Sequence, residues 1–130
     1  MTAAALLNTV RAHGMRVSSA RRNVLDALLN ADQPLTAEEI AAGADIASTY
    51  RNLDALETIG IVRHVHLGHG PGRYALAMRS GGWATCETCG RSTALEPDAL
   101  SRIRAAVKEA SGFDASFGHF PIVGRCPECI

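Results

Sequence analysis

The chain has 130 residues, of which 47% are hydrophobic and 20% charged, as in an ordinary globular protein. This composition excludes a disordered chain, and the longest uncharged apolar run is too short to cross a membrane. The 13 basic and 13 acidic residues balance, which argues against an indiscriminate polycation but leaves a local nucleic-acid contact open. The N-terminus has no signal-peptide pattern, so we expect a cytoplasmic protein without a membrane partner.

Three helices are predicted in the first third of the chain. The segment Ala3–Ala12 is rich in alanine and leucine and is followed by Gly14, a residue type that terminates helices. Ser18 is the expected N-cap of the second helix. Thr36 and Glu39 fit a capping box, in which hydroxyl and carboxylate each satisfy an orphan amide, so a short third helix follows.

A fourth helix is predicted to begin after Asp45 and to end at Ile59. At about 100° per residue, its apolar residues fall on one stripe, which we expect to face the core: Ile46, Leu53 and Leu56. Arg51 falls on the opposite side together with small residues. Two helices joined by a brief turn are typical of a helix-turn-helix, although a plain helical bundle has the same periodicity.

The next segment favours the helix-turn-helix. Ile61–Leu67 and Arg73–Leu76 are strand-like, and the turn cluster Gly-His-Gly-Pro-Gly separates them. A helix-turn-helix followed by a hairpin is a winged helix, in which Arg63 and Arg73 would lie on the wing beside a DNA duplex. Arg16 adds to the same basic face.

Two adjacent glycines after residue 80 mark a boundary between two parts of the chain. We expect a winged-helix domain at 1–79, a hinge at 80–83 and a smaller domain at 84–130, which together make an α+β fold. In the smaller domain, Arg91–Glu96 is strand-like, Pro97–Ala110 is an amphipathic helix, and Phe113–Arg125 is suited to strands. This part has too few apolar residues for an independent core, so we expect zinc and a partner chain to stabilise it.

Four cysteines occur after residue 85, as two Cys-x-x-Cys pairs: Cys86, Cys89, Cys126 and Cys129. Two such pairs provide four thiolates for one tetrahedral Zn²⁺ ion. Two disulfides or two redox pairs are the alternative, which a cytoplasmic location disfavours. Four thiolates close the coordination shell, so we predict a structural zinc and no catalytic position.

Several motifs in this order resemble those of the ferric uptake regulator family of metal-responsive repressors. The matching segments are Met-Arg-Val-Ser-Ser-Ala-Arg-Arg at 15–22, Thr-Ala-Glu-Glu-Ile at 36–40, Ser-Thr-Tyr-Arg-Asn-Leu at 48–53, Gly-Ile-Val-Arg at 60–63 and Gly-Arg-Tyr at 72–74, followed by both cysteine pairs and Gly-Phe at 112–113. The resemblance covers nearly the whole chain. It implies an N-terminal winged helix, a C-terminal dimerisation domain with structural zinc, and repression when a second metal ion is bound.

The resemblance also implies which residues contact DNA and which bind the sensory metal. Ser48, Tyr50 and Arg51 would lie on the recognition helix, where a guanidinium reads guanine or holds a phosphate. His119 and Glu96 match positions of family metal ligands. The alternative interpretations are an ordinary strand histidine for His119 and a helix-capping carboxylate for Glu96.

This chain departs from the family pattern just before its first cysteine pair. Members typically carry a histidine-rich run there, whereas this chain reads Ser-Gly-Gly-Trp-Ala-Thr. A regulatory site would therefore combine His119 and Glu96 with histidines of the wing: His64, His66 and His69. His64 and His66 share one face of a strand by the two-residue period, although solvent exposure or phosphate contact is the alternative for each.

We therefore predict a homodimeric transcriptional repressor, not an enzyme, that binds a palindromic double-stranded DNA operator. Its expected cofactors are one structural Zn²⁺ per chain and a second divalent ion, which is Zn²⁺, Fe²⁺, Ni²⁺ or Mn²⁺. One alternative is a repressor of the same fold that has lost metal sensing or that senses oxidants through its thiols. The other is a zinc-ribbon interaction module without specific DNA binding.

Overall fold

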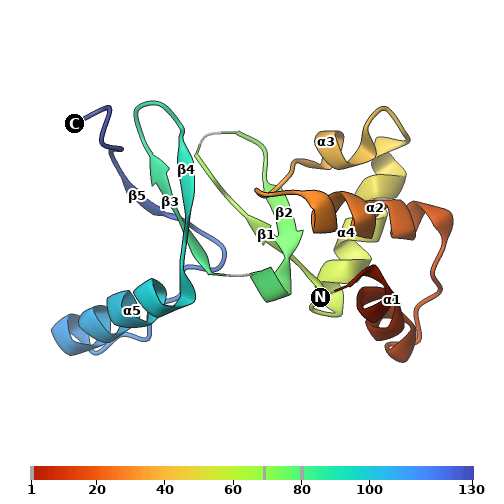
Figure 1. Cartoon of the computed structure of the whole chain (residues 1–130), viewed down its shortest axis with the longest axis horizontal. Helices are drawn as coiled ribbons and strands as arrows, with labels where there is room; N and C mark the ends of the chain where they lie inside the picture. Colours follow the sequence, from red (N-terminus) through yellow and green to blue (C-terminus); the bar gives the residue numbers. More distant parts are fainter. Residues whose placement is uncertain (1, 69, 80) are drawn as a thin grey trace. The chain divides into compact units, whose positions relative to one another are not determined.

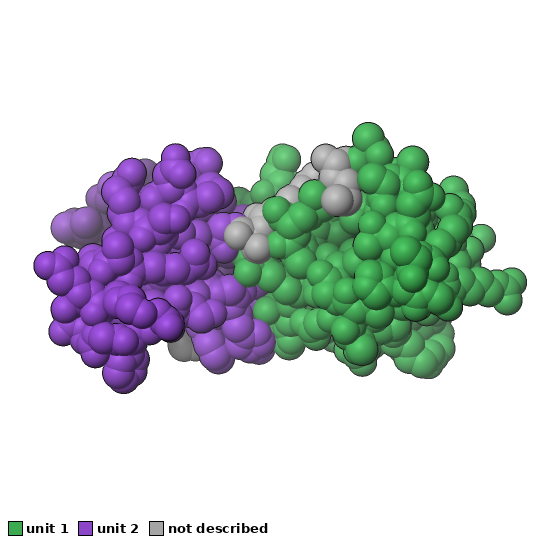
Figure 2. Space-filling view, turned by 90° about the horizontal axis from the view of Figure 1, so that it is seen from below, with its two compact units in different colours: residues 1–64, 73–79 green, residues 65–72, 80–130 purple. Residues whose placement is uncertain are grey.

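The computed structural model describes residues 2–68, 70–79 and 81–130. The chain divides into two compact units, coloured separately in Figure 2: unit 1 is 1–64 with 73–79, and unit 2 is 65–72 with 80–130. Both helices and sheets are present, as the predicted α+β class requires. Within the described part of the chain, no helix has the length and apolar character needed to cross a bilayer.

The helices of unit 1 begin where the sequence provides a capping side chain. They are α1 (Ala3–Ala12), α2 (Ser19–Asn30), α3 (Ala37–Ala41) and α4 (Ile46–Thr58), shown from red to yellow in Figure 1. The Ser18 hydroxyl accepts a hydrogen bond from the amide of Arg21 at 3.1 Å. Thr36 and Glu39 form the predicted capping box. The predicted caps are confirmed because these interactions are local and need no tertiary partner.

The core of unit 1 is formed by aliphatic side chains from all these helices and from the hairpin, among them Val10, Leu28, Leu53, Leu56 and Leu76. The prediction that Ile46 belongs to this core is wrong, since 37% of its surface is exposed. Ile46 is the first residue of α4 and lies beyond the edge of the core. The buried side of α4 is instead formed by Thr49, Asn52, Leu53 and Leu56.

The predicted hairpin follows α4 as β1 (Val62–Val65) and β2 (Arg73–Leu76). Tyr74 of β2 also pairs with Leu35, through amide-to-carbonyl distances of 2.7 and 3.0 Å. This bridge fixes the hairpin to the loop before α3. β1 begins one residue later and ends two residues earlier than predicted. At its end, the amide of His66 donates to the carbonyl of His119 at 2.9 Å, and both residues belong to unit 2.

A salt bridge reinforces the start of α3. Arg73 Nη1 donates to Glu39 Oε1 at 3.1 Å and to the carbonyl of Pro34 at 3.2 Å. The amide of Thr36 donates to the same carboxylate at 3.0 Å. This amide bond, followed by the Thr36 hydroxyl and the charge of Arg73, holds the pKa of Glu39 below its ordinary value of 4.5.

We expect Glu39→Gln to lower the free energy of unfolding at neutral pH by less than about 1 kcal/mol, because half of the Glu39 side chain is exposed to solvent. A pKa depressed in the folded state stabilises the fold above the unfolded value, and this stabilisation disappears as the pH falls through the folded value. The difference in the free energy of unfolding between wild type and Glu39→Gln should therefore shrink below about pH 4.5.

Urea unfolding at several pH values measures this difference in free energy. Glu38→Gln, in the same turn of the helix, is the matched control. A difference that stays constant down to pH 3 would contradict this role.

Unit 2 contains a three-stranded sheet of order β4-β3-β5, in which β3 is central. Its elements are β3 (Gly82–Cys86), β4 (Ser92–Leu95), α5 (Pro97–Ser111) and β5 (Ile122–Gly124). β3 pairs antiparallel with β4 and parallel with β5, after α5 has provided the crossover. The predicted strand at 91–96 and helix at 97–110 are confirmed, whereas only 122–124 of the segment 113–125 forms a strand.

The two glycines expected in a hinge are closely packed. A Cβ atom on Gly81 would lie 2.2 Å from the carbonyl oxygen of Leu95, and one on Gly82 would lie 3.0 Å from the Leu100 side chain. Gly82 and Trp83 are already part of β3, and Trp83 is buried. Two glycines here allow β4 and α5 to approach β3. Ser80 lies outside the described residues.

Unit 2 has few buried apolar side chains. Those of the described residues are Val65, Trp83, Cys86 and Leu100. The side of α5 predicted to be apolar is only partly covered, since Leu100 is its one buried residue. Four large apolar side chains of unit 2 are exposed: Phe113, Phe120, Val123 and Ile130.

Candidate functional site

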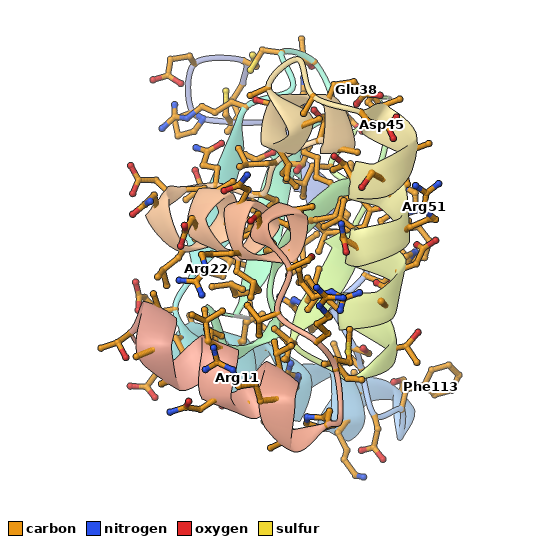
Figure 3. All side chains as sticks on the ribbon, turned by 90° about the vertical axis from the view of Figure 1, so that its right-hand side faces the viewer. Arg11, Arg22, Glu38, Asp45, Arg51 and Phe113 are labelled. Atoms are coloured by element: carbon orange, nitrogen blue, oxygen red, sulfur yellow. The ribbon has the colours of Figure 1, made fainter. Side chains whose placement is uncertain are left out.

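The outer face of α4 presents polar and aromatic side chains. Arg51 is exposed and points away from the helix, as Figure 3 shows. Tyr50 is 39% exposed, and Ser48 is half-buried one turn before Arg51. Asp45 caps the helix by accepting the amide of Ala47 at 3.3 Å. The face therefore offers a guanidinium and a phenol, the groups that contact base edges and phosphates.

Sequence reasoning missed Ile46 as a part of this face. Its exposed side chain lies one turn before Tyr50, at the spacing that places two side chains on the same side of a helix. The helical periodicity places Ile46 on the same side of the helix as Leu53 and Leu56. Periodicity alone does not show how far along the helix the core extends. The position of Ile46 as the first residue after the N-cap is the signal for exposure at the helix end.

The other predicted DNA-contacting arginines are in three different environments. Arg16 is exposed, and its carbonyl accepts a hydrogen bond from Arg21 at 2.6 Å. Arg63 on β1 is half-buried, and burial lowers the pKa of its guanidinium. Arg73, the first residue of β2, is bonded to Glu39 and to Pro34. Arg51 and Arg16 are thus the exposed members of the predicted set.

The four cysteines meet in unit 2. All four sulfur atoms lie within 4.8 Å of one another, and no disulfide joins them. Cys89 Sγ and Cys126 Sγ are 3.7 Å apart. With Zn–S bonds of about 2.3 Å, two ligands of a tetrahedral zinc ion are separated by about 3.8 Å, whereas disulfide sulfurs lie about 2.05 Å apart. The donor set therefore fits one structural Zn²⁺ ion.

The electrostatics of the cluster lead to the same conclusion. The amides of Cys126 and Cys89 hydrogen-bond the sulfur of Cys86 and lower its pKa to about 6. Hydrogen bonding with the thiols of Cys126 and Cys86 raises the pKa of Cys129 to about 12. Without a cation, one thiolate forms easily and the fourth is strongly disfavoured. A divalent ion removes this conflict because it neutralises the thiolate charge.

Backbone hydrogen bonds shape both knuckles. The amide of Gly90 donates to the carbonyl of Cys86 at 2.9 Å, and the amide of Cys129 donates to that of Cys126 at 2.9 Å. Between the knuckles, Arg91 forms a salt bridge with Glu128. The sulfur atoms are thus positioned by tight turns at the ends of β3 and β5.

Two of the candidate regulatory histidines meet in unit 2. The ring centroids of His66 and His119 are 4.7 Å apart, with an interplanar angle of 77°. Phe120 stacks on His66 at 5.6 Å and meets His119 edge-on at 4.6 Å. His119 lies in a bend and not in a strand. The pair therefore offers two imidazoles that both contact one phenyl ring.

The remaining regulatory candidates differ in their surroundings. His64 is on β1 in unit 1, where its ring stacks on Tyr74 at 5.0 Å. Glu96 is the exposed N-cap residue of α5, but its side chain makes no capping hydrogen bond. His69 lies outside the described residues. Among the described residues, no aspartate or glutamate lies close enough to join the ligand atoms of His66 and His119.

A winged helix followed by a small domain with a four-thiolate zinc site defines a class of metal-binding transcription regulators. The model of the ferric uptake regulator family matches residues 12–118 of this chain. The chain belongs to this family, whose members are metal-binding transcriptional repressors and not enzymes.

Curated relatives and solved structures match over nearly their whole length. The chain is 25% identical to the peroxide operon regulator of Bacillus subtilis, with 95% of this chain and 90% of the relative covered. It is 27% identical to the peroxide-responsive repressor PerR of Staphylococcus aureus, with 93% and 86% covered.

Among solved structures, the chain is similar to the Helicobacter pylori ferric uptake regulator, which has three functional metal-binding sites. The TM-score is 0.75 and the sequence identity is 22%, and the match covers 99% of this chain and 94% of that structure. The manganese-bound Pseudomonas aeruginosa regulator has a TM-score of 0.68 at 24% identity, over 92% of this chain and 96% of its own. At these identities the structures show a shared fold.

Proposed function

We propose that this chain is a transcriptional repressor that binds a palindromic operator as a homodimer and responds to a divalent metal ion. The observation that carries the proposal is the outer face of α4, with Tyr50 and Arg51 exposed in a winged helix. In helix-turn-helix proteins this helix enters the major groove. Arg51 is the side chain to read a base, and Arg16 adds a phosphate contact.

Unit 2 supports the proposed dimer. Several of its large apolar side chains are exposed, and β5 is an edge strand of the sheet. An unpaired edge with exposed apolar neighbours favours association with a second copy. A two-fold dimer presents two copies of α4 to two half-sites about one helical turn of DNA apart, which makes the operator palindromic.

The proposed signal is a second metal ion bound apart from the four cysteines. His66 and His119 provide two imidazoles within unit 2. His64, Glu96 and His69 complete the set of candidates expected from the sequence. A metal that favours the DNA-binding conformation raises operator affinity, and by reciprocity operator DNA raises metal affinity.

Peroxide is the second candidate signal. The relatives from Bacillus subtilis and Staphylococcus aureus are named for their peroxide response. Cys89 is exposed to solvent in this chain, and exposed thiolates are susceptible to oxidation. Oxidation would remove zinc ligands and loosen unit 2, so peroxide would release the operator.

A DNA-binding titration tests the function. We expect the zinc-loaded protein to protect a palindromic segment upstream of its own gene, and to bind it more tightly when a second divalent ion is added. The same titration after hydrogen peroxide treatment tests the second candidate. Equal operator affinity with and without zinc, iron, nickel or manganese would refute metal sensing. The absence of any protected segment would refute the operator itself and support an interaction module.

A further inference from the structure

Two exposed large apolar side chains of unit 1 lie one turn apart on α4. Among the described residues of this unit, the exposed large apolar side chains are Ile46, Tyr50 and Met78. Ile46 and Tyr50 are four residues apart, which places them on the same side of the helix. One exposed isoleucine is ordinary on a protein surface, but this one lies on the helix that we propose to enter the major groove. Its neighbours on α4 therefore bear on what it contacts.

The charges of α4 indicate which part of its outer face suits a close approach to DNA. Arg51 is exposed on the second turn, whereas Asp54 is exposed one turn after Tyr50 and the half-buried Glu57 follows. Carboxylates disfavour contact with phosphates because like charges repel, so the C-terminal half of α4 is poorly suited to the duplex. The first two turns are better suited, and the N-terminal residues of a recognition helix are those that contact base edges.

The first turn of α4 offers an apolar surface. Its sequence, Ile-Ala-Ser-Thr, contains no basic residue, and both Ile46 and Ala47 are exposed. The N-cap carboxylate of Asp45 accepts a hydrogen bond from the amide of Ala47 at 3.3 Å, and its negative charge disfavours a phosphate at this turn. Of the four bases, only thymine presents an apolar group in the major groove, its C5-methyl. The first turn therefore matches thymine better than any other base.

We propose that Ile46 contacts the C5-methyl group of one thymine in each operator half-site and thereby selects that base. With a rise of about 1.5 Å per residue, Ile46 and Arg51 are about 7.5 Å apart along the axis of α4, or about two base-pair steps of DNA. The thymine is therefore expected within about three base pairs of the base that Arg51 reads. The inference rests on the proposed function, because it requires operator binding.

The test removes the methyl group from the DNA. It uses the full zinc-loaded chain and the palindromic segment that this chain protects upstream of its own gene. Each thymine of one half-site is replaced in turn by deoxyuridine, which keeps every hydrogen-bonding group of the base and lacks only the methyl. At one position, we expect the replacement to weaken binding by the wild type about fourfold, the effect of leaving one methyl-sized group unburied.

Substitution of Ile46 removes the other partner of the contact. Ile46→Ala keeps the helix, because alanine is the better helix former, and should bind the thymine and deoxyuridine operators equally well. Ile46→Val, which keeps a branched apolar side chain, should retain part of the difference. Met78→Ala is the matched control, since Met78 is an exposed apolar residue of unit 1 outside α4, and it should respond to deoxyuridine as the wild type does.

The outcomes separate this contact from operator binding itself. Equal sensitivity of wild type and Ile46→Ala to deoxyuridine at every thymine would overturn the contact and leave the proposed function intact. Uniform weakening of all DNA sequences by Ile46→Ala, with the deoxyuridine effect unchanged, would also overturn it. The absence of any protected segment would refute the proposed function, and the inference with it.

Discussion

Replacing Cys86 by serine is expected to release the structural zinc and to unfold unit 2 while unit 1 stays folded. The aliphatic core cluster belongs entirely to unit 1, whereas unit 2 buries few apolar side chains among its described residues. Structural zinc contributes about 10–16 kcal/mol in small zinc domains, which exceeds what such a core supplies. Hydrogen bonds from the amides of Cys126 and Cys89 lower the pKa of Cys86 to about 6, so its thiolate forms readily.

The measurement combines metal content, sedimentation and hydrogen exchange. Cys86→Ser should contain much less than one zinc per chain, sediment as a monomer and lose protection in β3, β4 and β5, whereas α1, α2 and α4 stay protected. Thr88→Ser, a change in the same knuckle that keeps all four sulfur atoms, is the control and should retain zinc. A Cys86→Ser protein that stays dimeric with full zinc would rule out the structural role of the cluster.

Local features were predictable because their causes lie within a few residues. Ser18, Thr36 and Asp45 each satisfy amides of the turn that follows, so the starts of α2, α3 and α4 agree with the sequence. The four cysteines were predictable for a related reason: two short Cys-x-x-Cys turns provide the complete donor set. Neither inference needed the tertiary structure.

Features that depend on distant packing could not be predicted. Gly81 and Gly82 give the same sequence signal whether they make a flexible linker or allow Leu95 and Leu100 to approach closely. The meeting of His66 and His119 depends on a parallel strand crossover, and 52 residues separate the two in the sequence. Their proximity therefore had to come from the fold.

Arg51→Ala is expected to weaken operator binding by about 1–3 kcal/mol, or roughly 5- to 150-fold, if the guanidinium reads a base. The reason is geometric: Arg51 is exposed on the face of α4 opposite Leu53 and Leu56, and a forked donor matches the two acceptors of guanine. The Arg51→Ala protein should also lose its preference for one particular base at one position of each half-site. Arg51→Lys keeps the charge but loses the fork, so it should retain more affinity than specificity.

A salt series separates base reading from phosphate contact. If Arg51 only neutralises a phosphate, Arg51→Ala should weaken all DNA sequences alike and reduce the salt slope by about 1. Arg11→Ala is the matched control, because Arg11 is an exposed arginine of α1 in the same unit and its loss changes the net charge equally (Figure 3). The net charge of the chain is zero, so charge loss alone should have a small effect on binding. Equal operator affinities of wild type, Arg51→Ala and Arg11→Ala would show that α4 is not the recognition helix. The DNA-binding surface would then be formed by Arg16 and the wing.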